Sequence, residues 1–198
     1  MRTEWALGAV AAGVVVSSFG PWLGSPSHAQ AQPEKSAVPS EMQVIDGGFL
    51  AIDTPKGWER VEGPGLACFV AKGASVTDAA ILIYISGAPI GEKESAKNRK
   101  EYIQSDIDEF KQRFPDGTVR EVESLELPKT KARVPVVYFE SKQQHNAFEQ
   151  VVYLEEQSRV LTLVLSAKNR QAFEKGLPLF KVFAKSYSGS VTVVSDPK

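Results

Sequence analysis

The chain has 198 residues, of which 42% are hydrophobic and 24% are charged, and its formal net charge is −1 at pH 7. This length and composition are typical of one globular domain with a single hydrophobic core. The near-neutral charge, without a basic patch or a polybasic stretch, argues against nucleic-acid binding and against electrostatic attachment to a membrane surface.

The N-terminus has the pattern of a secretory signal peptide. Arg2 precedes an unbroken apolar run at 6–16, and small residues then lead to Ala29-Gln30-Ala31, which fits a cleavage site, with Ser27-His28-Ala29 as an alternative. The apolar run is too short for a spanning helix, which needs about 20 apolar residues. The pattern therefore predicts cleavage and export.

These features also predict the domain boundaries. We expect a signal peptide at 1–31, a polar linker at 32–43, one folded domain at 44–187 and a C-terminal tail at 188–198. The mature protein is expected to be periplasmic or extracellular and monomeric, with no stable insertion in the membrane after cleavage. The single cysteine, Cys68, lies in an apolar run and is expected to be a small buried side chain rather than a reactive thiol.

Strand-like segments precede a first helix. Periodicity predicts short strands after Gly48 and then at 58–62 and 67–73. The near-continuous apolar run at 79–90 predicts a strand that is buried on both faces or covered by a helix. Helical spacing of apolar residues then predicts a helix from Ser95 to the stop signal at Pro115, with one apolar face made of Ala96, Ile103, Ile107, Phe110 and Phe114.

Further strands and a second helix follow. The short polar segments between the next strands are typical of hairpin turns, so these strands are predicted to form an antiparallel meander. The last helix is expected to begin at the cap Asn169, with Gly176 ending a first piece and Pro178 starting a second, bent piece. The meander strands are predicted at 118–127, 134–141, 147–156 and 159–167.

Runs of strands with helices at their ends predict an α+β domain, in which helices cover an antiparallel sheet. Several residues then resemble a known family, the PsbP-like α/β/α sandwich domains, which include the extrinsic photosystem II subunit and a Ran-binding import factor. The last helix carries AFEKxLPxFxxFxxS from Ala172 to Ser186, and the entry to the buried strand carries Phe49, Pro55, Gly57 and Trp58. The resemblance covers about residues 44–187. It implies the sandwich fold and a non-enzymatic accessory role, and it implies no binding residues.

No catalytic residue, metal ligand or cofactor site stands out. His145 is the single histidine after the predicted signal, and Glu155 and Glu156 are strand neighbours whose side chains are expected to point to opposite faces. Phosphate-binding loops and a nucleophile elbow are absent from the sequence. We therefore expect a protein that is not an enzyme, and a site made of carboxylates from distant strands is left open.

Two binding functions remain. The first is docking onto a protein or assembly of the cell envelope, through a hairpin tip at 143–146 and a loop at 86–93, because exposed loops on a rigid scaffold are common recognition sites. The candidate residues are Gln143, Gln144, His145, Asn146, Ser86, Gly87 and Pro89. The second function is carriage of a small apolar ligand between sheet and helix, in a pocket lined by Phe110, Phe114, Phe180 and Phe183.

Overall fold

The computed structural model describes residues 42–45, 48–89, 95–156 and 159–192. The predicted signal peptide and most of the predicted linker lie outside these residues. The strands are β1 (Met42–Ile45), β2 (Gly48–Ala51), β3 (Trp58–Val61), β4 (Ala67–Ala71), β5 (Ile81–Pro89), β6 (Thr118–Leu127), β7 (Ala132–Glu140), β8 (Phe148–Glu156), β9 (Arg159–Ala167) and β10 (Ser190–Thr192), and the helices are α1 (Ser95–Arg113) and α2 (Arg170–Ser186).

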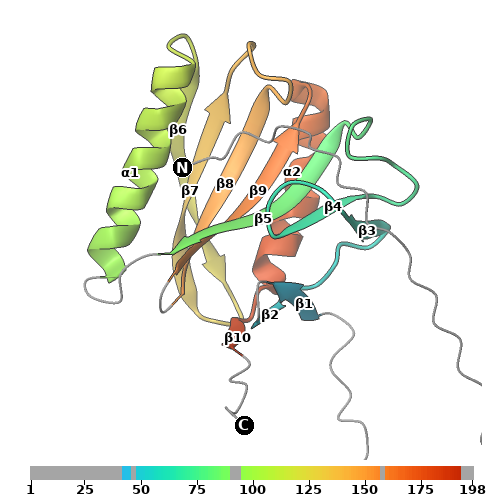
Figure 1. The fold of residues 1–198 in the computed structure, drawn as a ribbon, viewed down its shortest axis with the longest axis vertical. Coiled ribbons are helices and arrows are strands. Elements are labelled where there is room, and N and C mark those ends of the chain that lie inside the picture. Colours follow the sequence, from blue (N-terminus) through green and yellow to red (C-terminus); the bar gives the residue numbers. More distant parts are fainter. Residues whose placement is uncertain (1–41, 46–47, 90–94, 157–158, 193–198) are drawn as a thin grey trace, which may run out of the picture. The chain divides into compact units, whose positions relative to one another are not determined.

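Seven of the strands form one antiparallel sheet in the order β3-β4-β5-β9-β8-β7-β6 (Figure 1). From β6 to β9, each strand pairs with the next one along the chain, which confirms the predicted meander. β5 then pairs with β9 over its whole length, from Ile81 opposite Ala167 to Pro89 opposite Arg159.

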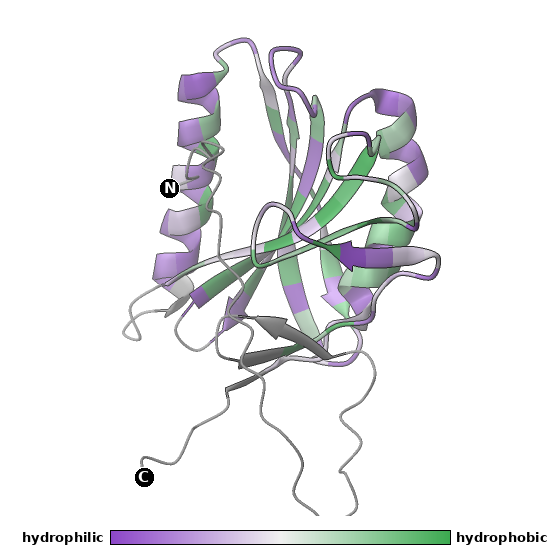
Figure 2. Ribbon diagram, turned by 45° about the vertical axis from the view of Figure 1, so that its right-hand side comes forward, coloured by the Kyte–Doolittle hydropathy of each residue, from purple (hydrophilic) through white to green (hydrophobic). Residues whose placement is uncertain are grey.

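The two helices cover opposite faces of this sheet, because side chains alternate along each strand. The odd-numbered residues of β9 from Leu161 onward pack with Phe180 and Phe183 of α2, on what we call the α2 face. Val160 and Val164 of β9 instead pack with α1, on the α1 face. Figure 2 shows hydrophobic residues alternating with hydrophilic ones along both helices. The predicted α+β sandwich, with helix, sheet and helix as its layers, is therefore confirmed.

The helix α2 is continuous, although Gly176 and Pro178 lie in its middle. Asn169 caps its start as predicted, and its side-chain oxygen accepts a hydrogen bond from the Ala172 N–H at 2.9 Å. The expectation of two helical pieces is wrong. Pro178 has no N–H to donate to the carbonyl of Glu174, four residues earlier in the helix. Both residues are exposed, so water can hydrate that carbonyl on the outer side of the helix.

Gly176 has a packing role. The residue is buried, and a Cβ at this position would lie 2.9 Å from Leu165 Cδ1 and 3.2 Å from Ile81 Cγ2. The missing side chain therefore lets α2 approach β9 and β5 closely.

The helix α1 packs through the apolar face that the sequence predicts. Polar contacts supplement this face: the Tyr153 hydroxyl donates to Asp106 at 2.5 Å, and Arg99 forms an ion pair with Glu155 at 2.6 Å. The packed residues are Ile103, Ile107, Phe110 and Phe114, of which Ile107 and Phe110 are buried. Ala96, the fifth residue of the predicted face, lies where no side chain is described.

The chain ends of the described part meet in a small sheet. β1 and β10 both pair antiparallel with β2, on its two sides. The Ser188 N–H donates to the Ala51 carbonyl at 2.9 Å, and the Ser190 hydroxyl donates to Glu156 at 2.5 Å. The described strands thus extend from Met42 to Thr192, and β10 lies within the range that was predicted to be a tail.

Candidate functional site

The predicted hairpin tip (143–146) does lie between β7 and β8, and Ser141 organises it. The buried Ser141 donates its N–H to the Ala147 carbonyl at 2.9 Å, and its hydroxyl accepts the Gln143 N–H at 3.2 Å. Its carbonyl accepts the Gln144 N–H at 3.3 Å. Gln143 and His145 are exposed at this tip, whereas Gln144 and Asn146 are half-buried. The hairpin tip is therefore an ordered turn with exposed polar side chains.

The prediction of a loop at 86–93 is wrong for its first four residues. Ser86, Gly87 and Pro89 belong to β5, and they pair with β9. β4 contacts β5 only through the pairs from Ala67 to Phe69, so beyond residue 85 the strand β5 has one neighbour among the described strands. A proline is tolerated there because its missing N–H faces an open edge. Residues 90–93 lie outside the described residues.

The two halves of the predicted docking surface lie at opposite ends of the sheet. The hairpin tip follows Glu140 and precedes Phe148, which pairs with Ala167 at one end of β9. Ser86 to Pro89 pair with Thr162 to Arg159, toward the other end of β9. These ends are separated by five to eight residues, or roughly 17–26 Å of extended strand. The seven candidate residues therefore do not form one surface.

A cluster of interacting side chains lies directly beside the hairpin tip, at the end of the α2 face. Tyr138 and Glu140 are two residues apart on β7 and so share this face. The Tyr138 hydroxyl donates to Glu140 Oε2 at 2.5 Å. The Arg170 guanidinium, at the start of α2, donates to both Glu140 oxygens at 3.1 and 3.0 Å. The helix start, the sheet and the base of the hairpin are thus tied together.

Arg120 completes this tyrosine–arginine cluster (Tyr138, Glu140, Arg170 and Arg120). It stands opposite Tyr138 on β6, and its guanidinium carbon lies 4.3 Å from the Tyr138 ring centre. Arg170 is placed similarly over the ring of Phe148, at 5.1 Å. Both guanidinium groups are therefore held against aromatic rings, which limits their conformational freedom.

The cluster shifts the pKa values of its members. Burial, followed by the hydrogen bond to Glu140, raises the pKa of Tyr138 to about 12. The hydrogen bond from Tyr138 and the charge of Arg170 hold the pKa of Glu140 below its usual value. At neutral pH the tyrosine is therefore protonated and the carboxylate is charged, as the hydrogen bond between them requires.

The sequence analysis did not find this cluster. The spacing of Tyr138 and Glu140 before a hairpin was a usable signal, since residues two apart on a strand lie on one face. Arg120 and Arg170 lie far from them in the sequence, and only the strand register and the position of α2 bring them near.

The predicted ligand pocket lined by four phenylalanines does not exist. Phe110 and Phe114 belong to the cluster on the α1 face, whereas Phe180 and Phe183 lie on the α2 face, with the sheet between the pairs. Phe180 and Phe183 are also 0% and 1% exposed, and Phe183 packs edge-on against Phe69. Helical spacing predicted that these residues face the core, but it could not show which face of the sheet each helix covers.

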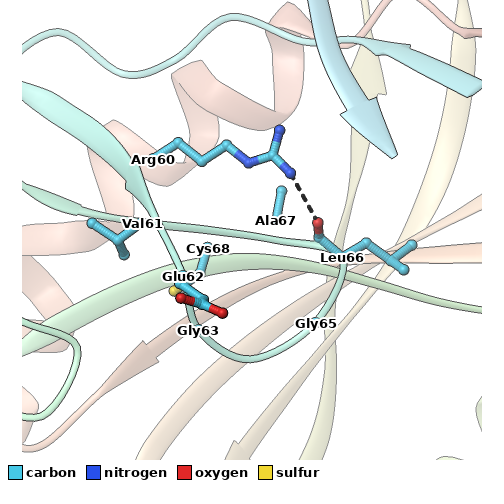
Figure 3. Close-up of a pocket in the computed structure, with 8 residues that line it drawn as sticks. All are labelled: Arg60, Val61, Glu62, Gly63, Gly65, Leu66, Ala67 and Cys68. Carbon is cyan, nitrogen blue, oxygen red and sulfur yellow. Dashed lines mark hydrogen bonds between the residues drawn. The ribbon is translucent and has the colours of Figure 1, made fainter. Parts of the chain in front are cut away.

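A pocket of about 460 Å³ lies along the connection from β3 to β4 (Figure 3). Two glycines, Gly63 and Gly65, are among its lining residues, and the Arg60 guanidinium donates to the Leu66 carbonyl at 3.3 Å. Gly65 adopts φ +76°, and a Cβ there would lie 2.2 Å from the Ile85 carbonyl oxygen, so glycine is required for this close approach. The lining residues are Arg60, Val61, Glu62, Gly63, Gly65, Leu66, Ala67 and Cys68.

Cys68 lines this pocket and is buried, as predicted. A Cβ on Gly63 would lie 2.9 Å from its sulfur, so the loop passes directly over the thiol. Burial raises the pKa of Cys68 to about 11, which keeps the thiol protonated and poorly nucleophilic at neutral pH. Among the lining residues, only Arg60 and Glu62 carry a charge, and they do not make a catalytic set.

Three carboxylates of the sheet are held by contacts with side chains of other elements. Glu155 and Glu156 point to opposite faces as predicted, because the first pairs with Arg99 and the second accepts from Ser190. Glu149 is buried on the α1 face, where it accepts the Ser166 hydroxyl at 3.0 Å. Within the described ranges, no three His, Cys, Asp or Glu side chains gather closely enough to hold a metal ion.

No helix in the described ranges combines the length and apolar character needed to cross a membrane.

Comparisons with known proteins bear on the fold. No protein-family model matches the chain, and no curated protein matches it. Among solved structures, it is similar to the solution structure of cyanobacterial PsbP (CyanoP) from Synechocystis sp. PCC 6803, with a TM-score of 0.47 and 10% sequence identity, over 80% of this chain and 98% of that chain. This similarity to a PsbP structure concerns the fold alone, and no residue role is transferred from it.

Proposed function

We propose that the chain is an exported, non-enzymatic accessory protein that docks onto a protein of the cell envelope through its hairpin tip. The observation that carries this proposal is the ordered turn at 143–146. Ser141 organises this turn through hydrogen bonds, and the tyrosine–arginine cluster fixes the end of β7 from which the turn begins. The backbone of an ordered turn loses little conformational entropy on binding, which favours recognition through its exposed polar side chains.

Export and the lack of an enzymatic role are supported by separate observations. The N-terminal pattern of a positive residue, an apolar run and a small-residue exit favours export. Among the residues that the structure describes, the clearly shifted pKa values belong to Cys68, beneath a loop, and to the cluster, where Tyr138 and Glu140 hydrogen-bond each other. These arrangements stabilise a fold rather than activate a nucleophile or a base.

A comparison of two loop variants tests the docking proposal. In the first variant, Gln143 to Asn146 are replaced by Gly-Ser repeats. In the control, Lys129 to Lys131, in the turn between β6 and β7 at the opposite end of the sheet, are replaced in the same way. The wild type and each variant are expressed in cells of the source organism, crosslinked mildly in the envelope and captured for mass spectrometry. The melting temperature of each purified protein is also measured.

We expect one envelope protein to be crosslinked by the wild type and by the control, and to be lost with the hairpin variant at an unchanged melting temperature. Capture of that protein by both variants would show that the hairpin tip is not the docking surface. Capture of no protein by the wild type would contradict the docking function itself.

A further inference from the structure

Arg120 is an exposed cation with a fixed orientation and no hydrogen bond or ion pair to a described residue. Its guanidinium lies on the ring of Tyr138, which is itself 2% exposed and held by Glu140. Arg170 differs from it, because the Nη2 of Arg170 donates to both oxygens of Glu140. The tyrosine–arginine cluster holds two guanidinium groups and one carboxylate, so it carries one net positive charge, although Glu140 interacts electrostatically with both arginines.

We propose that Arg120 is the anchor by which the hairpin end of the molecule binds an acidic segment of a partner protein, and this inference rests on the proposed docking function. A planar guanidinium can donate two parallel hydrogen bonds to a carboxylate, and stacking on a ring leaves its N–H edge available. Arginine residues that are held in place in this way are common anchors of protein interfaces.

The surroundings of Arg120 fit an anionic group. Lys142, two residues after Glu140 at the base of the hairpin tip, is exposed and adds a second positive charge to this end of the sheet. Glu121, the acid next to Arg120, points to the other face of the sheet because neighbours on a strand alternate. Arg120 itself lies on β6, an edge strand of the seven-stranded sheet, so a partner can approach it from the side.

An acidic protein segment fits this surface better than a lipid membrane does. Surfaces that insert into the lipid interface usually carry exposed Trp, Phe or Leu side chains. In the described part of the chain, Val182 is the one large hydrophobic side chain that is exposed, at 71%, and it lies on α2, three turns beyond Arg170. The hairpin end therefore offers charge and hydrogen bonds without an apolar anchor.

The test is a titration with a defined acidic probe. The protein is purified as its cells export it, labelled with ¹⁵N and titrated with hexaglutamate, and hexaglutamine serves as the uncharged control. We expect hexaglutamate to shift the signals of β6 around Arg120, of β7 around Tyr138 and of the hairpin tip. The affinity should fall as NaCl is raised from 50 to 300 mM, because exposed charges are screened.

Three variants localise the binding. Arg120→Glu should lower the affinity for hexaglutamate at least tenfold. Arg120→Lys should cause an intermediate loss of affinity, because lysine lacks the planar guanidinium that stacks on the Tyr138 ring. Arg133→Glu, an exposed arginine at the other end of the sheet, changes the net charge equally and should leave the affinity unchanged. Arg120→Gln replaces Arg120→Glu if the latter lowers the melting temperature.

Several outcomes would overturn this inference. They are equal shifts with hexaglutamine, shifts spread evenly over the surface, an affinity that is insensitive to Arg120→Glu, or binding to phosphatidylglycerol vesicles without binding to hexaglutamate. The failure of this inference can be distinguished from the failure of the proposed function. If capture of the crosslinked partner depends on the hairpin tip but not on Arg120, the docking function stands and Arg120 is not the anchor. If hexaglutamate binds at Arg120 but no partner is captured, the anion site stands and the docking function is wrong.

Discussion

The two faces of the sheet are covered in different ways. On the α2 face, α2 packs on an apolar cluster that extends from Leu50 to Tyr187. Ser186, at the end of α2, is a buried polar side chain on this face. On the α1 face, apolar contacts from α1 alternate with polar ones, such as Tyr153 with Asp106 and the buried Glu149. Burial of apolar area is the main source of stability, so the α2 face is expected to set the stability of the fold.

This difference suggests a division of roles. The helix α2 approaches the sheet so closely that Gly176 cannot carry a side chain, and its first residue, Arg170, reaches the tyrosine–arginine cluster. The cluster and the hairpin tip are therefore supported by the more stable face. α1 is held by fewer apolar residues and by the partly exposed ion pair of Arg99 with Glu155, which contributes less.

The largest effect on stability is expected when one buried phenylalanine on each face is replaced by alanine and the two losses are compared. Phe180→Ala should lower the free energy of unfolding by about 3–5 kcal/mol, because Phe180 is 0% exposed and closely surrounded. Phe110→Ala should cost less, since Phe110 lies near the end of α1 beside the half-buried Phe114, which can move into the space. Urea unfolding measures both values. An equal or greater loss with Phe110→Ala would contradict the difference between the faces.

The second prediction tests the close approach of α2. Gly176→Val should lower the free energy of unfolding by about 1–3 kcal/mol, because the new side chain would overlap Leu165 and Ile81. Lys175→Val places the same side chain on the exposed side of α2 and should cost less than about 1 kcal/mol. Thermal and urea unfolding of the two variants give the comparison. Equal losses would show that helix propensity, rather than packing, determines the effect.

The third prediction concerns the pH dependence that the cluster contributes. An unfolded tyrosine ionises near pH 10, whereas Tyr138 keeps its proton until about pH 12. Its contribution is thus fully present below pH 10 and is lost as pH rises from 10 to 12, by roughly 1–2 kcal/mol. Tyr138→Phe should flatten this part of the stability curve, measured by urea unfolding from pH 9 to 12. An unchanged slope would contradict the assigned pKa.

The smallest effect is expected on the α1 face. Arg99→Ala removes the ion pair with Glu155, whose partners are 26% and 23% exposed, and should cost about 0.5 kcal/mol. Lys100→Ala, at an exposed neighbouring position, is the control. Hydrogen exchange of the α1 amides should increase with Arg99→Ala while that of α2 is unchanged. Faster exchange in both helices would show that the two faces are coupled.

Much of the fold could be predicted because local patterns determine it. The apolar spacing of α1, the cap Asn169 and the polar turns between the meander strands are signals within a few residues. The errors have physical causes. Gly87 and Pro89 were interpreted as a loop although a strand with an open edge tolerates both residues, and Pro178 was assigned to a break although an exposed proline fits within α2.

The candidate site could be predicted only in part. The hairpin tip was predicted from its turn residues, since turn chemistry is local. Arg120 and Arg170 could not be found in that way, because their positions depend on which strand β6 pairs with and on where α2 begins. For the same reason, the four phenylalanines were assigned to one pocket, since helical spacing does not show which face of a sheet a helix covers.

The small sheet determines how the molecule can be attached. Ile45 of β1 and Thr192 of β10 both stand opposite Gly48, so they lie about two strand spacings, or roughly 10 Å, apart. This sheet contacts Glu156, at the far end of β8 from Phe148, and the nine residues of that strand extend about 30 Å. A fusion partner or solid support joined at β1 or β10 therefore leaves the hairpin tip about 30 Å away and accessible.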